Sequence, residues 1–337
     1  MSKKLSVAIV GLSMGSFHLK AAIQYGANIA AICDTNPELL KKLGDECNIP
    51  KERRFLDYKE FVNNPSIDAV VLATPDQLHL PMTEAFMAAG KHVMCEKPLA
   101  LTRDELEKIV AVTRKYDKKF MIGQICRFTP AFMKAKEIID AGTIGEVYFV
   151  ESEYAHDYAK ILNGWRADPN RHGVVGGGCH AVDLLRWFVG DPVEVFAYGS
   201  HKLLPTVTYD DATISVLKFP NGIIGKIFVS TGCKRPYTMR TLIYGTKGTV
   251  ICDNTSPSME LYTLKENDTS VNKTPTIIPL EVNNHNAFGE FTVFAEAIEK
   301  DIPLVMDAVQ GAKTIAACLA IVESAKTGKP VAPDYSF

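Results

Sequence analysis

The sequence has no strong imbalance of charge. It contains 37 lysine and arginine residues against 39 aspartate and glutamate residues, a formal net charge of −2. Because no stretch is strongly basic, a nucleic-acid-binding surface is not indicated, and a small polar ligand is the expected partner. Hydrophobic residues make up 47% and charged residues 23%, the balance of a folded globular protein rather than a disordered one.

Long hydrophobic runs are also missing. The apolar run at residues 5–10 is too short for a secretion signal and is interrupted at once by Gly11. By inspection, no segment approaches the ~18 consecutive apolar residues that span a bilayer. We therefore expect a cytoplasmic protein that does not engage a membrane.

The eight cysteines form no C-x-x-C pair. Several, such as Cys33, Cys95 and Cys252, lie in apolar strand-like runs, where buried reduced thiols of a cytosolic protein are expected. Cys179 and His180 are adjacent, but adjacent residues rarely chelate one ion and no second cluster has metal-ligand spacing. We expect no metal site.

The length of 337 residues fits two domains. The first 125 residues alternate strand and helix signals, which predicts a doubly wound parallel sheet covered on both faces. Thr102 followed by Glu105 predicts a capping box at the start of one helix. The expected strands are residues 5–10, 29–33, 69–73, 92–95 and 120–122, and the expected helices are residues 37–47, 80–89 and 102–116.

From residue 126 the pattern changes and most segments carry strand signals. This predicts a second α/β domain, residues 126–337, with a large, mainly antiparallel open sheet. Tight turns at residues 220–222 and 245–248 join consecutive strands. One face of such a sheet can meet a second subunit, so we expect a homodimer or homotetramer. The expected strands are residues 147–154, 193–200, 212–219, 223–230, 240–244, 249–252 and 259–264; the expected helices are 130–141, 287–300 and 307–326, the last two packing back on the rest of the protein.

A glycine turn follows the first strand and leads into a helix. In dinucleotide-binding folds such glycines let the backbone approach a pyrophosphate, and the helix N-terminus supplies free N–H groups. Gly11, Ser13, Met14 and Gly15 are the candidate contacts. Ser13 stands where the usual G-x-G-x-x-G spacing has its second glycine, and a plain turn explains the segment equally well on its own.

Asp34 strengthens the dinucleotide interpretation. It ends the second strand, where a carboxylate accepts hydrogen bonds from ribose hydroxyls and repels a 2′-phosphate. No arginine accompanies it at Thr35 or Asn36, so NAD is favoured over NADP. The alternative is a helix cap before Pro37.

Lys97 lies just past the carboxyl end of a buried strand, the edge where open α/β sheets bind ligands. Glu96 and Pro98 flank it and constrain its backbone. A positioned ammonium could donate to a reacting hydroxyl and stabilise a developing alkoxide, although most lysines at a sheet edge are surface charges.

Together with Ala73-Thr74-Pro75, His79 and the Gly90-Lys91-His92-Val93 to Glu96-Lys97-Pro98 segment, these features resemble the Gfo/Idh/MocA oxidoreductases, whose typical members include glucose–fructose oxidoreductase and inositol 2-dehydrogenase. Nearly the whole chain takes part in the resemblance. The further segments that follow the family's order are Arg127-Phe128 with Pro130, residues 145–147, 176–178, 180–183 and 327–331.

The resemblance implies a Rossmann domain, a second domain with an open sheet, and NAD(P) between them. In the family the lysine orients substrate and nicotinamide, and a histidine of the second domain acts as acid and base; these positions match Lys97 and His180. Further cofactor contacts are expected from Thr74, Pro75, His79, Glu96 and Arg127. From the residues themselves, the candidate substrate contacts are Arg127, His156, Trp165 and Arg166, because an aromatic ring beside polar hydrogen-bonding groups suits a sugar ring; ordinary packing or a surface position is the alternative for each.

His180 follows three glycines and is expected at a helix N-terminus, which would keep its imidazole neutral. A histidine satisfied by local hydrogen bonds is the alternative. Many family members carry an aspartate where Gly176 stands, so the lysine–aspartate–histidine set is incomplete. Asp183 lies on the same helical face as His180; it either orients the ring or caps the helix.

These features predict an NAD-dependent oxidoreductase that moves a hydride to or from a CH–OH carbon of a sugar, sugar derivative or cyclitol. In a second interpretation, tightly bound NAD oxidises a sugar carbon transiently, so that elimination or epimerisation follows without net NADH. In a third, the protein is a non-catalytic NAD-sensing regulator, although a sensor needs neither Lys97 nor His180.

Overall fold

The computed structural model describes residues 4–265 and 269–337 and divides into two compact units. The first unit combines Met1–Ile125 with Asn286–Ala312 and Phe337. The second combines Cys126–His285 with Lys313–Ser336. Each unit has its own sheet and its own buried core, and each is described by itself below.

The first unit contains a six-stranded parallel sheet in the order β3-β2-β1-β4-β5-β6. This is the order of a Rossmann fold, with its switch point between β1 and β4, and it confirms the expected doubly wound sheet. The short strand β3 was not predicted from the sequence. The strands are β1 (Ser6–Val10), β2 (Asn28–Cys33), β3 (Arg54–Phe55), β4 (Ala69–Leu72), β5 (His92–Glu96) and β6 (Phe120–Gly123).

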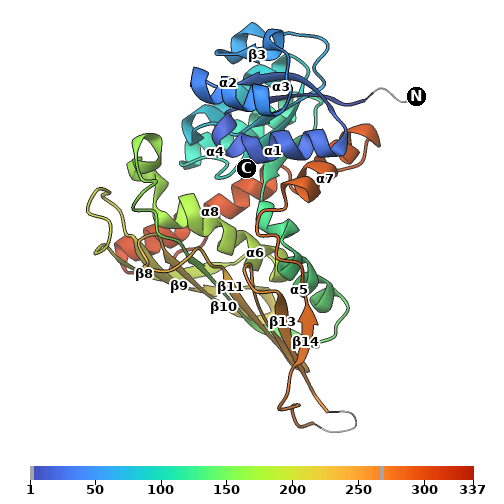
Figure 1. The fold of residues 1–337 in the computed structure, drawn as a ribbon. Helices are drawn as coiled ribbons and strands as arrows, with labels where there is room; N and C mark the ends of the chain where they lie inside the picture. Colours follow the sequence, from blue (N-terminus) through green and yellow to red (C-terminus); the bar gives the residue numbers. More distant parts are fainter. Residues whose placement is uncertain (1–3, 266–268) are drawn as a thin grey trace. The chain divides into compact units, whose positions relative to one another are not determined.

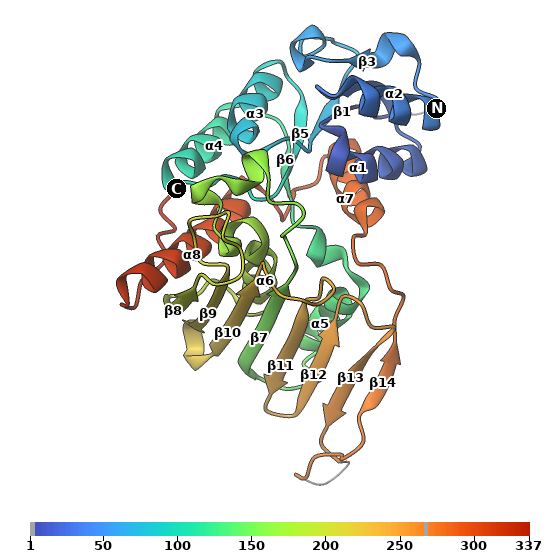
Figure 2. The ribbon, with the colours of Figure 1, turned by 60° about the vertical axis from the view of Figure 1, so that its left-hand side comes forward.

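Helices cover both faces of this sheet (Figure 2). Helices α1 and α7 lie side by side, with the rings of Tyr25 and Phe291 in edge contact at 5.7 Å. The capping box of Thr102 and Glu105 is confirmed at the start of α4. The helices are α1 (Leu12–Tyr25), α2 (Pro37–Glu46), α3 (His79–Ala88), α4 (Arg103–Lys115) and α7 (Ala287–Glu299), with short turns η1 (Lys51–Arg53), η2 (Tyr58–Glu60) and η3 (Asp76–Leu78).

The second unit contains an eight-stranded sheet in the order β14-β13-β12-β11-β7-β10-β9-β8. It is mainly antiparallel, as expected, but β7 and β10 pair in parallel. The edge strand β14 was not predicted. The strands are β7 (Val147–Ala155), β8 (Glu194–Ser200), β9 (Ala212–Lys218), β10 (Ile224–Ser230), β11 (Arg240–Gly245), β12 (Gly248–Asp253), β13 (Ser258–Thr263) and β14 (Thr276–Pro279).

Helices α5 and α6 and the second part of α8 cover one face of this sheet (Figure 1). No helix of the described residues packs on the other face, which exposes apolar side chains of neighbouring strands such as Tyr198, Ile214, Val216 and Ile224. The helices are α5 (Pro130–Asp140), α6 (Cys179–Val189) and α8 (Ala308–Thr327), with short turns η4 (Ile125–Phe128), η5 (Gly164–Ala167), η6 (Pro169–Arg171), η7 (Val174–Gly178) and η8 (Pro220–Gly222).

Helix α8 has no run of 18 consecutive apolar residues, but its average composition bears on whether a segment could span a bilayer. Its 20 residues are long and apolar enough to do so by length and composition. However, 61% of its apolar window is buried inside the fold. Burial of that extent is what the core helix of a globular domain shows, because its apolar side chains pack against protein.

Candidate active site

The carboxyl edge of the six-stranded sheet begins with Gly11, between β1 and α1. Its φ is +83°, and a Cβ there would collide with the carbonyl of Ala73, so only glycine fits. Gly15 packs closely too: a Cβ would lie 3.1 Å from Ile9 and 3.3 Å from Ala73. Helix α1 has no side-chain cap and no acidic residue in its first turn, which leaves its amino end suited to a phosphate. Ser13 and Met14 are exposed at this end.

Asp34 lies at the end of β2, beside the same helix. Its Oδ2 accepts the backbone N–H of Leu12 at 2.7 Å, and its Oδ1 accepts that of Asn36 at 2.8 Å. The cap of α2 is Asn36, whose side chain accepts from two backbone N–H groups. Asp34 is therefore not the cap before Pro37. Each carboxylate oxygen keeps a second lone pair that can accept a ribose hydroxyl.

Replacing Asp34 with alanine is expected to raise the KM for NAD about tenfold, because one charge-assisted hydrogen bond is lost. The KM for NADP should fall, since the repulsion of the 2′-phosphate is removed. Steady-state kinetics with both cofactors measure the ratio of the KM for NAD to the KM for NADP. Glu38→Ala, an exposed carboxylate on α2, removes the same charge and should leave the ratio unchanged. Equal ratios in Asp34→Ala and wild type would contradict the ribose role.

His79 begins α3 and is fully buried. Its Nδ1 lies 2.9 Å from the carbonyl oxygen of Pro98, and its Nε2 lies 3.1 Å from that of Thr74. The ring therefore holds the loop after β4 against the loop after β5, and the proposed cofactor role of His79 becomes one of positioning. Thr74 is buried as well, and its Oγ1 has no hydrogen-bond partner among the described residues. Pro75 follows it and precedes the short turn η3.

Glu96 closes β5 and accepts two hydrogen bonds. His18 Nε2 lies 2.8 Å from its Oε1, and the backbone N–H of Lys97 donates to its Oε2 at 3.1 Å. Burial acts to raise the pKa of Glu96, but the contacts with His18 and Lys97 outweigh it and hold the pKa below its ordinary value. Glu96 is thus a carboxylate at neutral pH, and it fixes the backbone from which the half-buried Lys97 side chain extends.

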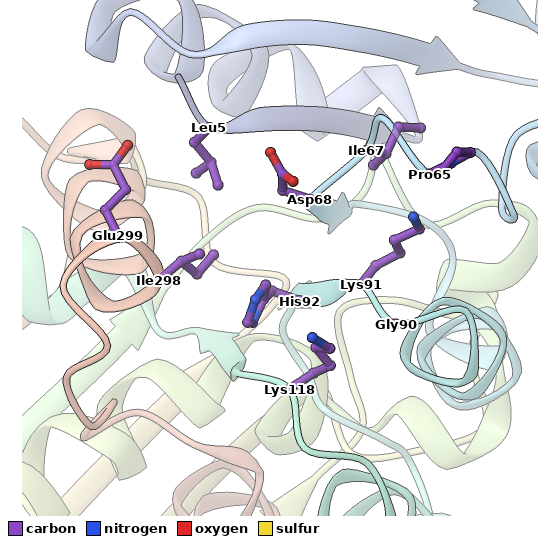
Figure 3. Close-up of a pocket in the computed structure, with 10 residues that line it drawn as sticks. All are labelled: Leu5, Pro65, Ile67, Asp68, Gly90, Lys91, His92, Lys118, Ile298 and Glu299. Atoms are coloured by element: carbon purple, nitrogen blue, oxygen red, sulfur yellow. The ribbon is translucent and has the colours of Figure 1, made fainter. Parts of the chain in front are cut away.

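A pocket of about 350 Å³ lies at the opposite edge of this sheet, at the amino ends of β1, β4 and β5 (Figure 3). Lys91 and Lys118 face it together with Asp68 and Glu299, so its charge does not favour a ligand of one sign. Burial, with Lys118 and Lys119 nearby, lowers the pKa of His92 at its rim to about 4. Parallel sheets bind cofactors at their carboxyl edge, so this pocket is not the dinucleotide site.

His180 lies in the second unit, in the first turn of α6, and only 3% of it is exposed. The expectation of a helix N-terminus at this residue was wrong. The π-helical turn η7 runs directly into α6, so His180 follows more than one turn of helical backbone. The field of a free helix end therefore does not act on the imidazole as supposed.

Asp183 and Arg127 form a buried ion pair in the same unit. Arg127 donates from Nε and Nη2 to the two carboxylate oxygens at 2.7 and 2.8 Å, and Thr314 donates to Oδ1 at 2.9 Å. Burial opposes the charged guanidinium, but the Asp183 carboxylate outweighs it and raises the pKa of Arg127. Breaking such a pair costs about 3–5 kcal/mol, so it holds η4 against α6.

An aromatic cluster meets His180 through Tyr154. The Tyr154 ring stacks on it at 6.0 Å, and the Tyr154 hydroxyl lies 2.6 Å from that of Tyr158 and 3.2 Å from Nδ1 of His156. Gly177 leaves room for both tyrosines, because a Cβ there would lie 2.6 Å from the Tyr158 hydroxyl. Burial raises the pKa of Tyr154 well above its ordinary value, so its hydroxyl stays protonated. We define the aromatic cluster as Tyr154, His156, Tyr158, His180, Tyr237 and His285.

Trp165 and Arg166 lie in η5, and the Arg166 guanidinium sits 4.2 Å from the centroid of the Trp165 ring. A second guanidinium, that of the buried Arg171, lies 4.9 Å from the same ring. A side chain at position 176 would collide with Nη1 of Arg171. Arg171 thus occupies the space into which a residue larger than Gly176 would extend.

Two family models match the chain. Residues 5–124 match the oxidoreductase family with an NAD-binding Rossmann fold, and residues 132–251 match the GFO/IDH/MocA C-terminal domain. The chain belongs to the Gfo/Idh/MocA oxidoreductase family. It is therefore an oxidoreductase with an NAD-binding first domain, as expected.

Several relatives of known name resemble this Gfo/Idh/MocA protein. Myo-inositol 2-dehydrogenase of Thermotoga maritima is 27% identical over 78% of this chain and 80% of its own. The uncharacterised oxidoreductase YrbE of Bacillus subtilis is 28% identical over 88% and 87%. A levoglucosan dehydrogenase solved in complex with NADH is 24% identical and shares the fold, with a TM-score of 0.89 over 98% of this chain and 100% of that one.

The residues at the carboxyl edge of the Rossmann sheet fit NAD. Gly11 lets the chain turn from β1 into α1 close against Ala73, the N-cap of α1 has no side-chain hydrogen bond, and Asp34 ends β2, where a ribose-binding carboxylate is expected. The buried hydroxyl of Thr74 offers a further polar group at this edge. In this Gfo/Idh/MocA protein we assign these residues, with Gly15 behind them, to holding the cofactor.

The sequence reasoning missed three residues of the second unit. Tyr237 and His285 join the aromatic cluster from segments far from β7, with ring centroids 5.8 Å apart. Arg171 lies against Trp165 and Gly176. The one sequence signal for Arg171 was Gly176, which stands where the family resemblance led us to expect an aspartate.

Proposed function

We propose that this protein is an NAD-dependent dehydrogenase that transfers a hydride between the nicotinamide and a CH–OH carbon of a sugar, sugar derivative or cyclitol. The family assignment supports the oxidoreductase class. The names of relatives, inositol 2-dehydrogenases and a levoglucosan dehydrogenase, support a polyol substrate. The observation that carries the proposal is the aromatic cluster around the buried His180, because rings combined with hydroxyls and imidazoles suit a sugar ring.

Each residue has a chemical role in this proposal. NAD, when bound, supplies the hydride acceptor. His180 takes the proton of the reacting hydroxyl, and Lys97 donates a hydrogen bond to the same oxygen and stabilises its developing negative charge. Glu96 holds Lys97 through the Lys97 backbone N–H. We assign Tyr154, Tyr158 and His156 to hydrogen bonds with the substrate hydroxyls. We assign Trp165 and Arg166 to contacts at the edge of the substrate site.

A screen of sugars, sugar acids and inositols with NAD, followed by the absorbance of reduced nicotinamide, tests this function. Turnover on at least one polyol is the expected result. If the screen shows none while mass spectrometry finds dinucleotide that copurifies with the protein, transient oxidation by retained NAD replaces the proposal. A stable complex with another protein, without turnover, would favour a regulator instead.

We also propose that the exposed face of the eight-stranded sheet joins copies of this chain into a homodimer or homotetramer. The pairs Tyr198–Ile214 and Phe196–Val216 stand directly opposite each other on β8 and β9. Ile224 of β10 extends the same apolar surface, with 55% of it exposed. Apolar side chains gathered on adjacent strands are typical of a surface that another protein covers.

Replacing Val216 with lysine is expected to split the oligomer into smaller species, because it would bury an unpaired charge in the interface. Light scattering after size-exclusion chromatography measures the mass. Val305→Lys is the matched control, since Val305 is 75% exposed and belongs to the first unit, whereas the proposed interface belongs to the second. A monomeric wild-type protein would rule the proposed interface out.

A further inference from the structure

Helix α7 carries a carboxyl group that the proposed chemistry does not use. Glu290 lies in the first turn of α7 with 0% of it exposed. Neither of its two carboxyl oxygens has a hydrogen-bond partner among the described residues. A carboxyl group in such a place is costly unless it is neutral and finds an acceptor for its proton, so Glu290 requires an explanation.

His18 presents the complementary group. Helix α1, which carries it, packs along α7 (Figure 1), and His18 is 1% exposed. Its Nε2 is bound to the Glu96 carboxylate, while its Nδ1 has no hydrogen-bond partner among the described residues. Two packed helices of the first unit thus bury an imidazole nitrogen and a carboxyl group whose hydrogen-bonding capacity is not met by described protein atoms.

The charges in this region decide the protonation states. Burial raises the pKa of Glu290 well above its ordinary value, and the negative charge of Glu96 raises it further. The amino end of α7 acts in the opposite direction, since a helix N-terminus favours an anion, but the two raising effects win. Among the described residues, Glu96 is the titratable group whose charge acts on Glu290, and His18 is bound to that same carboxylate. Glu290 is therefore a neutral acid with one O–H to donate, beside a Glu96 that is ionised.

With a neutral imidazole at His18, one arrangement of protons satisfies all three side chains. The Glu96 carboxylate can only accept, so Nε2 of His18 must carry a proton. In neutral imidazole, Nδ1 is then an acceptor. The Glu290 O–H is the buried donor on the adjacent helix that could match it, either directly after a side-chain rotation or through one bridging water. The tautomer of a histidine is set by the hydrogen bond made at its other nitrogen.

We propose that Glu290 is a positioning residue for Lys97: its protonated carboxyl donates toward Nδ1 of His18 and so holds the ring whose Nε2–H anchors Glu96 and, through Glu96, the backbone of Lys97. The expected effect on kcat rests on the proposed function, in which Lys97 contacts the reacting oxygen. The hydrogen-bond order Glu290, His18, Glu96, Lys97 does not depend on that role.

Two substitutions separate this positioning from simple packing. Glu290→Gln keeps a neutral donor of the same shape, whereas Glu290→Met keeps the volume and loses the donor. We expect Glu290→Gln to keep kcat within about twofold and Glu290→Met to lower it about tenfold, with the KM for NAD little changed in both, as for other outer partners of catalytic groups. Nitrogen-15 NMR of labelled histidine, with His18 assigned from a His18→Gln sample, should show a hydrogen-bonded Nδ1 in wild type and Glu290→Gln, and an Nδ1 that has lost this hydrogen bond in Glu290→Met.

A pH series of unfolding keeps the proposal testable if Glu290→Met does not fold. An acid whose pKa is raised by folding weakens the folded state as pH climbs above its unfolded value, near 4.5. The midpoint temperature of thermal unfolding should therefore fall in wild type relative to Glu290→Gln as the pH rises from about 5 to about 8. Glu299→Gln, on the exposed end of α7, is the matched control and should track wild type at every pH.

The outcomes are distinct. A Glu290→Met protein that keeps both the wild-type nitrogen-15 shift of His18 Nδ1 and wild-type kcat would overturn the proposal, as would a Glu290→Gln stability gain that does not change with pH. If no polyol is oxidised by wild type, the dehydrogenase proposal fails, but the NMR and unfolding measurements still decide the role of Glu290.

Discussion

Replacing Lys97 with methionine is expected to lower turnover by about 10²-fold or more, while NAD binds nearly as well as before. Methionine has similar length but can neither donate a hydrogen bond nor carry charge. The loss should fall on kcat, because the ammonium acts on charge that develops only in the transition state. Turnover of the polyol found in the screen and calorimetric titration of NAD measure the two effects.

The matched control for Lys97 is Lys118→Met. Lys118 is an exposed lysine of the same unit, at the pocket on the opposite edge of the sheet (Figure 3). It should retain wild-type turnover. If Lys97→Met turned over as fast as Lys118→Met, the lysine would be an ordinary surface charge, and the site would have to be sought elsewhere.

Replacing His180 with asparagine is expected to lower turnover by a similar factor, about 10²-fold or more, because the group that accepts the proton is removed. Asparagine keeps a polar side chain against Tyr154 without a base. Added imidazole should restore part of the activity, since a small base can enter the space that the ring leaves. Initial rates with increasing imidazole measure the rescue.

His201→Asn serves as the control for His180, because His201 is an exposed histidine of the same unit that lies outside the aromatic cluster. It should neither lose activity nor respond to imidazole. A His180→Asn protein with full turnover would mean that His180 serves only to pack against the aromatic cluster.

The sequence indicated most of the fold because its signals are local. A strand followed by Gly11 and a helix, and the Thr102–Glu105 capping box, depend on residues that are neighbours along the chain. The missed strands β3 and β14 are short edge strands, whose pairing comes from a partner and not from their own pattern. The parallel pairing of β7 with β10 also joins distant segments, and tight turns alone suggested antiparallel neighbours.

In the candidate site, too, local motifs could be predicted from the sequence and long-range contacts could not. Lys97 and His180 could be found from motifs, but the contacts around them could not. Asp183 was considered as a partner of His180, yet its oxygens accept hydrogen bonds from Arg127 and Thr314, which lie 56 and 131 residues away. The absence of a side chain at Gly176 was visible in the sequence, whereas its physical cause, the guanidinium of Arg171, required coordinates.

The most direct measurement is a crystal structure of the wild-type enzyme with NADH and the polyol that it oxidises. The account predicts one substrate oxygen about 3 Å from both Lys97 Nζ and a ring nitrogen of His180. A substrate oxygen that meets only one of these side chains, with the other directed elsewhere, would contradict it.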